Sequence, residues 1–310
     1  MSKMAYIFPG QGSQSLGMGK DLFDNFVAAR EVFEAADEAL EFSLSEMCFS
    51  GDEAGLQLTA NTQPAILTAS VAAFQAARAE GLPNPDFVAG HSLGEYSALV
   101  VTGVLDFADA VRTVRNRGTY MQEAVPVGVG AMAAILGLDV DAVETGCAEA
   151  AQGQICSPAN INSPSQVVIA GNAEAVDRAC EILKEKGAKR AIKLNVSAPF
   201  HSTLMMPAQE RLGVDLAALD YGEFTFPILH NIDAAINNAA SSVCGKLVSQ
   251  VSSPVQWLQT IENMIAGGVD KFIEIGPGKV LTGLVRQIDR DAAHFNIENT
   301  TSLRNTLETL

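Results

Sequence analysis

A serine between two glycines is the residue of this sequence with the clearest capacity for chemistry. It is Ser92, in the segment GHSLG at positions 90–94, which follows a short apolar run at 87–89 and precedes a helix-forming run. This spacing between a strand and a helix is the pattern of a nucleophile elbow, whose tight turn holds the hydroxyl out at a sheet edge. A chain with 26 glycines can contain the five residues by chance. The flanking strand and helix favour a nucleophile, which we predict Ser92 to be.

A serine hydroxyl needs a base to take its proton, and histidine is the usual base near neutral pH. Of the four histidines, His201 follows the last strand of an expected small unit, at a junction where clefts form. His230 also follows a strand and remains a competitor. His91 adjoins Ser92 and is expected to line the pocket, while His294 lies in the polar tail. We favour His201, whose ordinary pKa of about 6.5 predicts a loss of rate in mild acid.

The third member of a catalytic triad is missing from its expected place. No aspartate or glutamate ends a strand after the elbow in the order serine, acid, histidine that α/β-hydrolases use. The sequence therefore predicts that another group, such as a backbone carbonyl, orients the imidazole.

The glycine-rich loop FPGQGSQ at 8–14 directly follows a predicted first strand. Its glycine spacing does not fit a dinucleotide site, and no acid ends a second strand about 20 residues later. Sites of the α/β-hydrolase type take one oxyanion-hole amide from such a loop and the other from the residue after the nucleophile. Here these amides belong to Gln11 and Leu93, although an ordinary tight turn also explains the loop.

Composition limits the classes of function. A formal charge of −16 argues against nucleic acid and against an anionic membrane surface as partners. The five cysteines are odd in number and form no Cys-x-x-Cys motif, which suits a reducing cytosol and no structural zinc. No signal peptide and no stretch of transmembrane length is evident. We expect a soluble cytoplasmic protein that needs no metal or redox cofactor.

The elements that must position these residues suggest an α/β chain. Apolar strands are expected at 5–8, 87–89, 226–229 and 271–275, and helical patterns at 21–50, 61–81, 107–124 and 279–288. Thr62 is the expected N-cap of the second of these helices, with Pro64 in its first turn, and Asp106 is the expected N-cap of the third. The tail after residue 289 is expected to be peripheral.

Between 131 and 196 the order of elements changes to β-α-β-β-α-β, the ferredoxin-like unit. It is large enough to be a subdomain inserted into a larger one. We therefore predict a discontinuous α/β-hydrolase-like domain at 1–127 and 198–310, with a ferredoxin-like subdomain at 128–197 and the cleft between them holding Ser92.

Six motifs, taken together and in order, resemble one family. FPGQGSQ at 8–14, GHSLGEYSA at 90–98, RNRGTYMQEAVP at 115–126, NSPSQVVIAG at 162–171, APFHS at 198–202 and IGPGKVLTGL at 275–284 match the malonyl-CoA:acyl carrier protein transacylases. The match covers nearly the whole chain. The acyltransferase domains of fatty acid and polyketide synthases are similar too.

The resemblance implies roles for particular residues. Ser92 would be the nucleophile and His201 the base, with the Gln11 and Leu93 amides as the oxyanion hole and the Gln250 backbone carbonyl orienting the histidine. The substrate pocket that it implies is lined by Arg117, Gln11, His91, Met121 and Phe200.

Arg117 would hold the malonyl carboxylate, because a guanidinium pairs bidentately with a carboxylate and stays charged when desolvated. Helical periodicity alone cannot choose between Arg117 and Arg115, which lie on opposite borders of the apolar stripe of the 107–124 helix. Arg112 faces solvent there. The alternative for Arg115 and Arg117 is that they are surface arginines whose aliphatic stems lie along the apolar stripe and whose charged ends reach solvent. Phe200 resembles the malonyl-preferring pattern.

The implied reaction moves a malonyl group from malonyl-CoA to Ser92 and then to the phosphopantetheine thiol of acyl carrier protein, a step in fatty acid synthesis. The enzyme is expected to be monomeric and to dock its acidic partner through local basic residues near 189–193 and 279–290. A serine thioesterase or esterase with the same elbow is the first alternative, and a non-catalytic acyl-binding module is the second.

Overall fold

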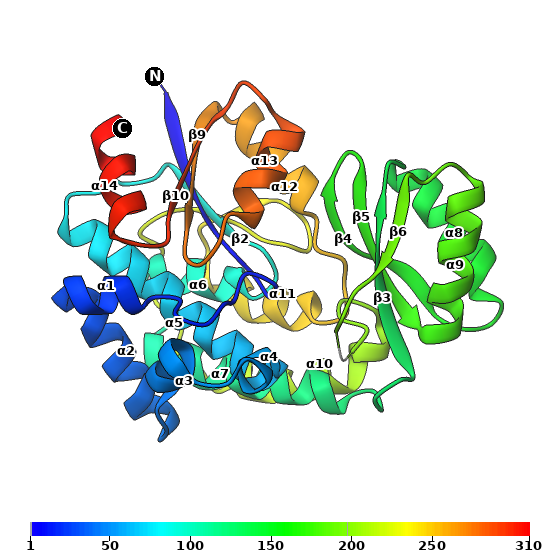
Figure 1. Ribbon diagram of the computed structural model, residues 1–310, viewed down its shortest axis with the longest axis horizontal. Coiled ribbons are helices and arrows are strands. Elements are labelled where there is room, and N and C mark those ends of the chain that lie inside the picture. The colour runs from blue at the N-terminus through cyan, green and yellow to red at the C-terminus, as the bar shows by residue number, and fades with distance from the viewer. Residues whose placement is uncertain (1, 197) are drawn as a thin grey trace.

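The computed structural model describes residues 2–196 and 198–310, so Met1 and Ser197 lie outside the described residues. It contains two sheets, each with its own helices (Figure 1). The prediction of an α/β fold with a small inserted sheet is confirmed. The boundaries predicted at 127/128 and 197/198 stay predictions, and Ser197 at the second boundary is not described.

The large sheet is parallel except at one edge. Its strand order is β10-β9-β1-β2-β7-β8, and only β8 runs antiparallel to its neighbour. The strands are β1 (Lys3–Phe8), β2 (Phe87–Gly90), β7 (Ile228–Leu229), β8 (Ile236–Asn237), β9 (Val269–Ile275) and β10 (Ala293–Ile297).

Helices cover both faces of this sheet, as parallel sheets require. Along β1, Tyr6 and Phe8 pack into one buried cluster with residues of α2, α5 and α6, while Ala5 and Ile7 pack into another with residues of α12 and α13. The helices of this part are α1 (Lys20–Asn25), α2 (Val27–Leu40), α3 (Leu44–Ser50), α4 (Glu53–Gln57), α5 (Thr59–Ala79), α6 (Gly94–Val101), α7 (Phe107–Glu123), α10 (Met206–Ala217), α11 (Val243–Gln250), α12 (Trp257–Ala266), α13 (Val280–Ile288) and α14 (Thr300–Thr309).

The small sheet is antiparallel, in the order β4-β5-β3-β6. Its elements follow the predicted β-α-β-β-α-β order: β3 (Gly130–Leu136), α8 (Val140–Ala151), β4 (Cys156–Ser163), β5 (Gln166–Asn172), α9 (Ala173–Glu185) and β6 (Arg190–Lys193). Both helices lie on one side of the sheet (Figure 1) and share a buried cluster with it.

Three predictions about elements were wrong in detail. The helical pattern at 21–50 is three helices rather than one, with breaks at Phe26 and at 41–43. Helix α5 begins at Thr59, and Thr62 does not cap it, since its hydroxyl donates to the Leu56 carbonyl at 2.6 Å. The tail after 289 is not peripheral: β10 pairs with β9, and Leu303 of α14 is fully buried. The N-cap at Asp106 is as predicted, since its carboxylate accepts from the first amides of α7.

Within residues 2–196 and 198–310, the helices all fall short of the length and apolar character needed to cross a membrane.

Candidate active site

The turn between β2 and α6 places Ser92 in a strained conformation. Its φ of +51° lies in the left-handed region that L-residues other than glycine rarely adopt. The flanking glycines leave room for this turn, because a Cβ added to Gly90 would lie 1.9 Å from the Gly94 backbone. A Cβ added to Gly94 would lie 2.0 Å from the Phe8 carbonyl oxygen. The predicted elbow geometry is therefore present, at the carboxyl end of a parallel strand.

His201 lies against the serine. Its Nε2 is 2.7 Å from Ser92 Oγ, and its Nδ1 is 2.9 Å from the backbone oxygen of Gln250. Because a carbonyl only accepts, Nδ1 carries the proton and donates to Gln250, which leaves Nε2 free to accept from the serine hydroxyl. The histidine is 3% exposed and, like Ser92, has a positive φ (+58°). The group that orients the imidazole is a carbonyl and not a carboxylate.

The surroundings of His201 oppose its protonation. Burial, followed by the positive charge of Arg117, lowers the pKa of His201 to about 3. The imidazole is therefore neutral across the ordinary pH range, the form in which it can accept a proton. The loss of rate expected in mild acid from an ordinary histidine pKa is accordingly displaced to lower pH. His91 also has a lowered pKa, mainly because it is buried.

Arg117, and not Arg115, is the arginine next to the serine. Its guanidinium is 2% exposed and donates to Ser92 Oγ (3.1 Å), to Gln250 Oε1 (2.9 Å) and to Gln63 Oε1 (2.8 Å). Burial lowers its pKa, and its Nε has no hydrogen-bond partner among the described residues. Arg115 instead donates to Asn61 Oδ1 at 2.6 Å and stacks on a phenylalanine ring away from the serine.

A buried guanidinium held by neutral oxygens is a ready partner for an anion. No carboxylate of the described residues lies within 4.0 Å of Arg117. Its charge is therefore available to a carboxylate that enters from outside.

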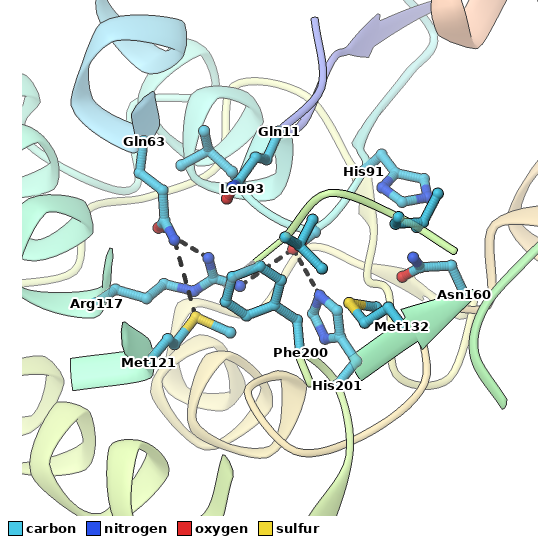
Figure 2. Close-up of a pocket in the computed structure, with 13 residues that line it drawn as sticks. Gln11, Gln63, His91, Leu93, Arg117, Met121, Met132, Asn160, Phe200 and His201 are labelled. Atoms are coloured by element: carbon cyan, nitrogen blue, oxygen red, sulfur yellow. Dashed lines mark hydrogen bonds between the residues drawn. The ribbon is translucent and has the colours of Figure 1, made fainter. Parts of the chain in front are cut away.

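The cavity beside Ser92 holds most of the predicted site residues. Its volume is about 100 Å³. Figure 2 shows Gln63, Met121 and Arg117 on one side of it and His91, Asn160 and Met132 on the other. Of the residues predicted from the sequence, the cavity is lined by Ser92, His201, Arg117, Gln11, Leu93, His91, Met121 and Phe200. Gln250 lies behind them, where it contacts both His201 and Arg117.

Gln11 and Leu93, whose backbone amides are the predicted oxyanion hole, both line this cavity. The loop after β1 touches the elbow closely, since a Cβ added to Gly10 would lie 2.4 Å from the His91 carbonyl oxygen. In the described part of the chain, neither the Gln11 nor the Leu93 backbone N–H has an acceptor. Two unpaired amides beside a nucleophile can bind a developing oxyanion.

The predicted competitor His230 lies away from the serine hydroxyl. It is fully buried, and its Nδ1 is 2.6 Å from the Glu95 carboxylate. His294 lies outside the cavity, next to Arg286.

Sequence reasoning missed several lining residues: Gln63, Met132, Asn160, Leu194 and Val196. Gln63 precedes Pro64 in α5 and is 1% exposed, which is unusual for glutamine. Its position directly before the largely apolar run at 64–74 was the one available signal. The others come from the small sheet or the chain after it, and no local pattern shows which of its residues line the predicted cleft beside Ser92.

Comparison with known proteins gives consistent results. The acyl transferase domain family matches residues 5–303. The malonyl CoA-acyl carrier protein transacylase of Bacillus subtilis is 48% identical over 311 residues, covering 100% of this chain and 98% of the relative. A solved malonyl CoA-acyl carrier protein transacylase from Coxiella burnetii superposes with a TM-score of 0.98 at 44% identity, covering 100% of this chain and 98% of that one.

One solved neighbour contains a second protein. It is a malonyl-transacylase in complex with its type II PKS acyl carrier protein. It superposes on this chain with a TM-score of 0.97 at 47% identity, and each chain is covered over its full length.

Proposed function

This chain belongs to the acyl transferase domain family, and from that premise we propose that Ser92 carries a malonyl group from malonyl-CoA to acyl carrier protein. The activity is that of a malonyl-CoA:acyl carrier protein transacylase, as the names of relatives at 45–49% identity and the complex with a carrier protein indicate. Nothing in these comparisons favours the thioesterase alternative. The observation that supports the residue assignment best is the 2.7 Å contact between Ser92 Oγ and His201 Nε2.

In the first half-reaction, Ser92 Oγ attacks the thioester carbonyl while its proton passes to His201 Nε2. The carbonyl oxygen becomes negative, and the free amides of Gln11 and Leu93 are suited to bind it. The C–S bond then breaks, and the CoA thiolate leaves with the proton from His201. A malonyl ester of Ser92 remains.

In the second half-reaction, His201 takes the proton of the phosphopantetheine thiol of acyl carrier protein. The thiolate attacks the malonyl ester, and the proton returns to Ser92 Oγ when the C–O bond breaks. No electron transfer occurs in either half, and His201 and the two amides supply the proton transfer and the oxyanion stabilisation, so the mechanism that we propose invokes neither a metal nor a redox cofactor.

Arg117 supplies selectivity in this proposal. A malonyl group ends in a carboxylate, and burying that charge without a partner would be costly. The guanidinium, already desolvated and 3.1 Å from Ser92 Oγ, can pair with it bidentately. Uncharged acyl groups cannot form this ion pair, so the contact favours malonyl over acyl groups that lack a carboxylate.

We further propose a monomer in the cytosol. Five cysteines without a disulfide suit a reducing compartment. Elution volume against protein concentration measures the oligomeric state.

The covalent intermediate is the first prediction. Malonyl-CoA alone should add one malonyl group to the intact protein, and holo-acyl carrier protein should remove it. Intact-protein mass spectrometry measures both steps, and peptide mapping should place the adduct on Ser92. An adduct that persists in Ser92→Ala would contradict the assignment, and rapid release of free malonate without carrier protein would favour the hydrolase.

A further inference from the structure

We propose that the buried Glu95 carboxylate is a positioning residue of this site, which acts by holding the side chains of Gln250 and Asn231. Glu95 lies in the first turn of α6, three residues after Ser92, and is 1% exposed. It contacts none of the reacting atoms, so its effect must pass through its partners. The inference rests on the proposed role of Ser92 as the nucleophile.

The carboxylate is fully engaged by donors from distant parts of the chain. Glu95 Oε1 accepts from His230 Nδ1 at 2.6 Å, and Oε2 accepts from Asn231 N at 3.0 Å and from Gln250 Nε2 at 2.9 Å. The Asn237 amide faces His230 Nε2 at 2.9 Å and is oriented by a backbone N–H that donates to its Oδ1. His230 Nε2 therefore accepts and Nδ1 donates to the carboxylate.

Glu95 determines which way the Gln250 amide points. A carboxylate only accepts, so Gln250 must present Nε2 to it, and the second hydrogen of Nε2 reaches the Ser92 carbonyl at 3.0 Å. Gln250 Oε1 is thereby aimed at Arg117 Nη2, 2.9 Å away. The backbone carbonyl of Gln250 accepts from His201 Nδ1 at 2.9 Å. One glutamine thus links the nucleophile, the base and the arginine, and Glu95 sets its orientation.

Asn231 anchors the strained turn in a similar way. Its Oδ1 accepts from Ser92 N at 2.6 Å, and its Nδ2 donates to the Gly90 carbonyl at 2.6 Å. These two bonds fix the backbone on both sides of His91, directly before the strained Ser92 with its positive φ. Since Glu95 holds the backbone N–H of Asn231, it also supports the elbow.

The charge of Glu95 adds a second effect. The negative carboxylate favours the protonated form of Arg117, which offsets part of the cost of burying the guanidinium. Because Gln250 stands between them, this stabilisation leaves the guanidinium itself without a carboxylate in contact. Arg117 thus remains charged, and its Nε–H, which has no acceptor among the described residues, remains available to substrate.

The test compares two buried glutamates. Glu95→Gln removes the charge and allows the Gln250 amide to turn over. It should slow malonyl loading of Ser92 by about 10- to 100-fold, as expected when reacting groups are misplaced by a fraction of an ångström. Glu274→Gln is the matched control. Glu274 is fully buried and caps α13 through the Leu281 and Thr282 amides, and it does not line the cavity. Both variants should lose thermal stability, but only Glu95→Gln should lose loading rate.

Three readouts separate positioning from a general loss of stability. Loading by malonyl-CoA and inactivation by phenylmethylsulfonyl fluoride, an uncharged serine reagent, should both slow in Glu95→Gln at a temperature well below its Tm. Glu95→Asp, which keeps the charge, should retain more activity than Glu95→Gln. If the glutamine variant does not fold, Glu95→Asp is compared with the wild type instead, and its loading rate should be reduced because its shorter side chain reaches Gln250 less well. The Glu95→Gln change should cost less in a Gln250→Ala background than in the wild type, because the two residues act in series.

The outcomes distinguish this inference from the proposed function. If wild-type protein takes up no malonyl group, the proposed function fails. If the wild type loads normally and Glu95→Gln loads at the same rate, only the positioning role of Glu95 is overturned. Equal slowing in Glu274→Gln, or full additivity with Gln250→Ala, overturns it as well.

Discussion

Arg117 sets the electrostatic conditions in which His201 works. Its guanidinium donates to Ser92 Oγ, which in turn contacts His201 Nε2. Its positive charge is the second largest cause of the lowered pKa of the histidine, after burial. A malonyl carboxylate bound to Arg117 would cancel this charge and make His201 a stronger base. Substrate binding and base strength are coupled in this arrangement.

That coupling predicts a shifted pH profile. Removing the charge in Arg117→Ala should raise the pKa of His201 from about 3, because a neighbouring positive charge disfavours the imidazolium. The rate requires neutral His201, so it falls as pH drops through that pKa. Inactivation by phenylmethylsulfonyl fluoride should therefore lose rate at a higher pH in Arg117→Ala than in the wild type. Arg115→Ala is the control and should leave the profile unchanged, and a shift common to both variants would contradict the assignment.

The sequence predicted these residues to different degrees. Ser92 carries a local signature, since the elbow needs glycines at fixed spacing and a strand and helix on either side. His201 and His230 both follow strands, and only the fold shows which imidazole approaches a serine 109 residues away. The sequence also indicated correctly that no acid occupies the third position. It could not show that Glu95, three residues after the nucleophile, is buried behind it, because a glutamate in the first turn of a helix is usually solvated.

The helices and strands were predictable where a pattern repeats. The β-α-β-β-α-β order and the Asp106 cap follow from alternation and capping residues that act locally. Prediction was weakest for β10, a short edge strand whose residues are mostly only half-buried. Its apolar residues at 293, 295 and 297 alternate with polar ones at 294 and 296, a short strand pattern that was missed in a tail expected to be peripheral. Pairing with β9, fixed by a parallel register, defines it as a strand. The local sequence does not show which strand β10 joins, because that choice depends on contacts between distant parts of the chain.

The C-terminal segment should therefore contribute to stability. Leu303 of α14 is fully buried in the same hydrophobic cluster as Tyr6 and Phe8 of β1. Leu303→Ala should therefore lower the free energy of unfolding by about 3 kcal/mol. Leu58→Ala is a matched control, because Leu58 is 59% exposed. Urea unfolding measures both variants. A loss below about 1 kcal/mol in the free energy of unfolding for Leu303→Ala would contradict a stabilising role of the C-terminal segment.

The molecule as a whole is acidic, with a formal charge of −16, and this matters for its protein partner. Carrier proteins of this class are expected to be acidic, so encounter needs a local basic surface. Strand β6 is a candidate: it is the edge of the small sheet, it begins at exposed Arg190, and the chain after it enters the cavity at Leu194. Lys193 is less available, because it pairs with Asp177 at 2.5 Å.

Charge reversal at this edge should separate the two half-reactions. Arg190→Glu should slow malonyl transfer to carrier protein several-fold at low salt, because an attractive charge becomes a repulsive one, and the difference should shrink as salt is added. Loading from malonyl-CoA should change little, because Arg190 does not line the cavity. Arg304→Glu makes the same change in net charge on α14, so it reports the effect of overall charge alone. If both variants slow transfer equally, net charge rather than the β6 edge governs the encounter; if Arg190→Glu slows loading as much as transfer, the edge is not a site specific to the carrier protein.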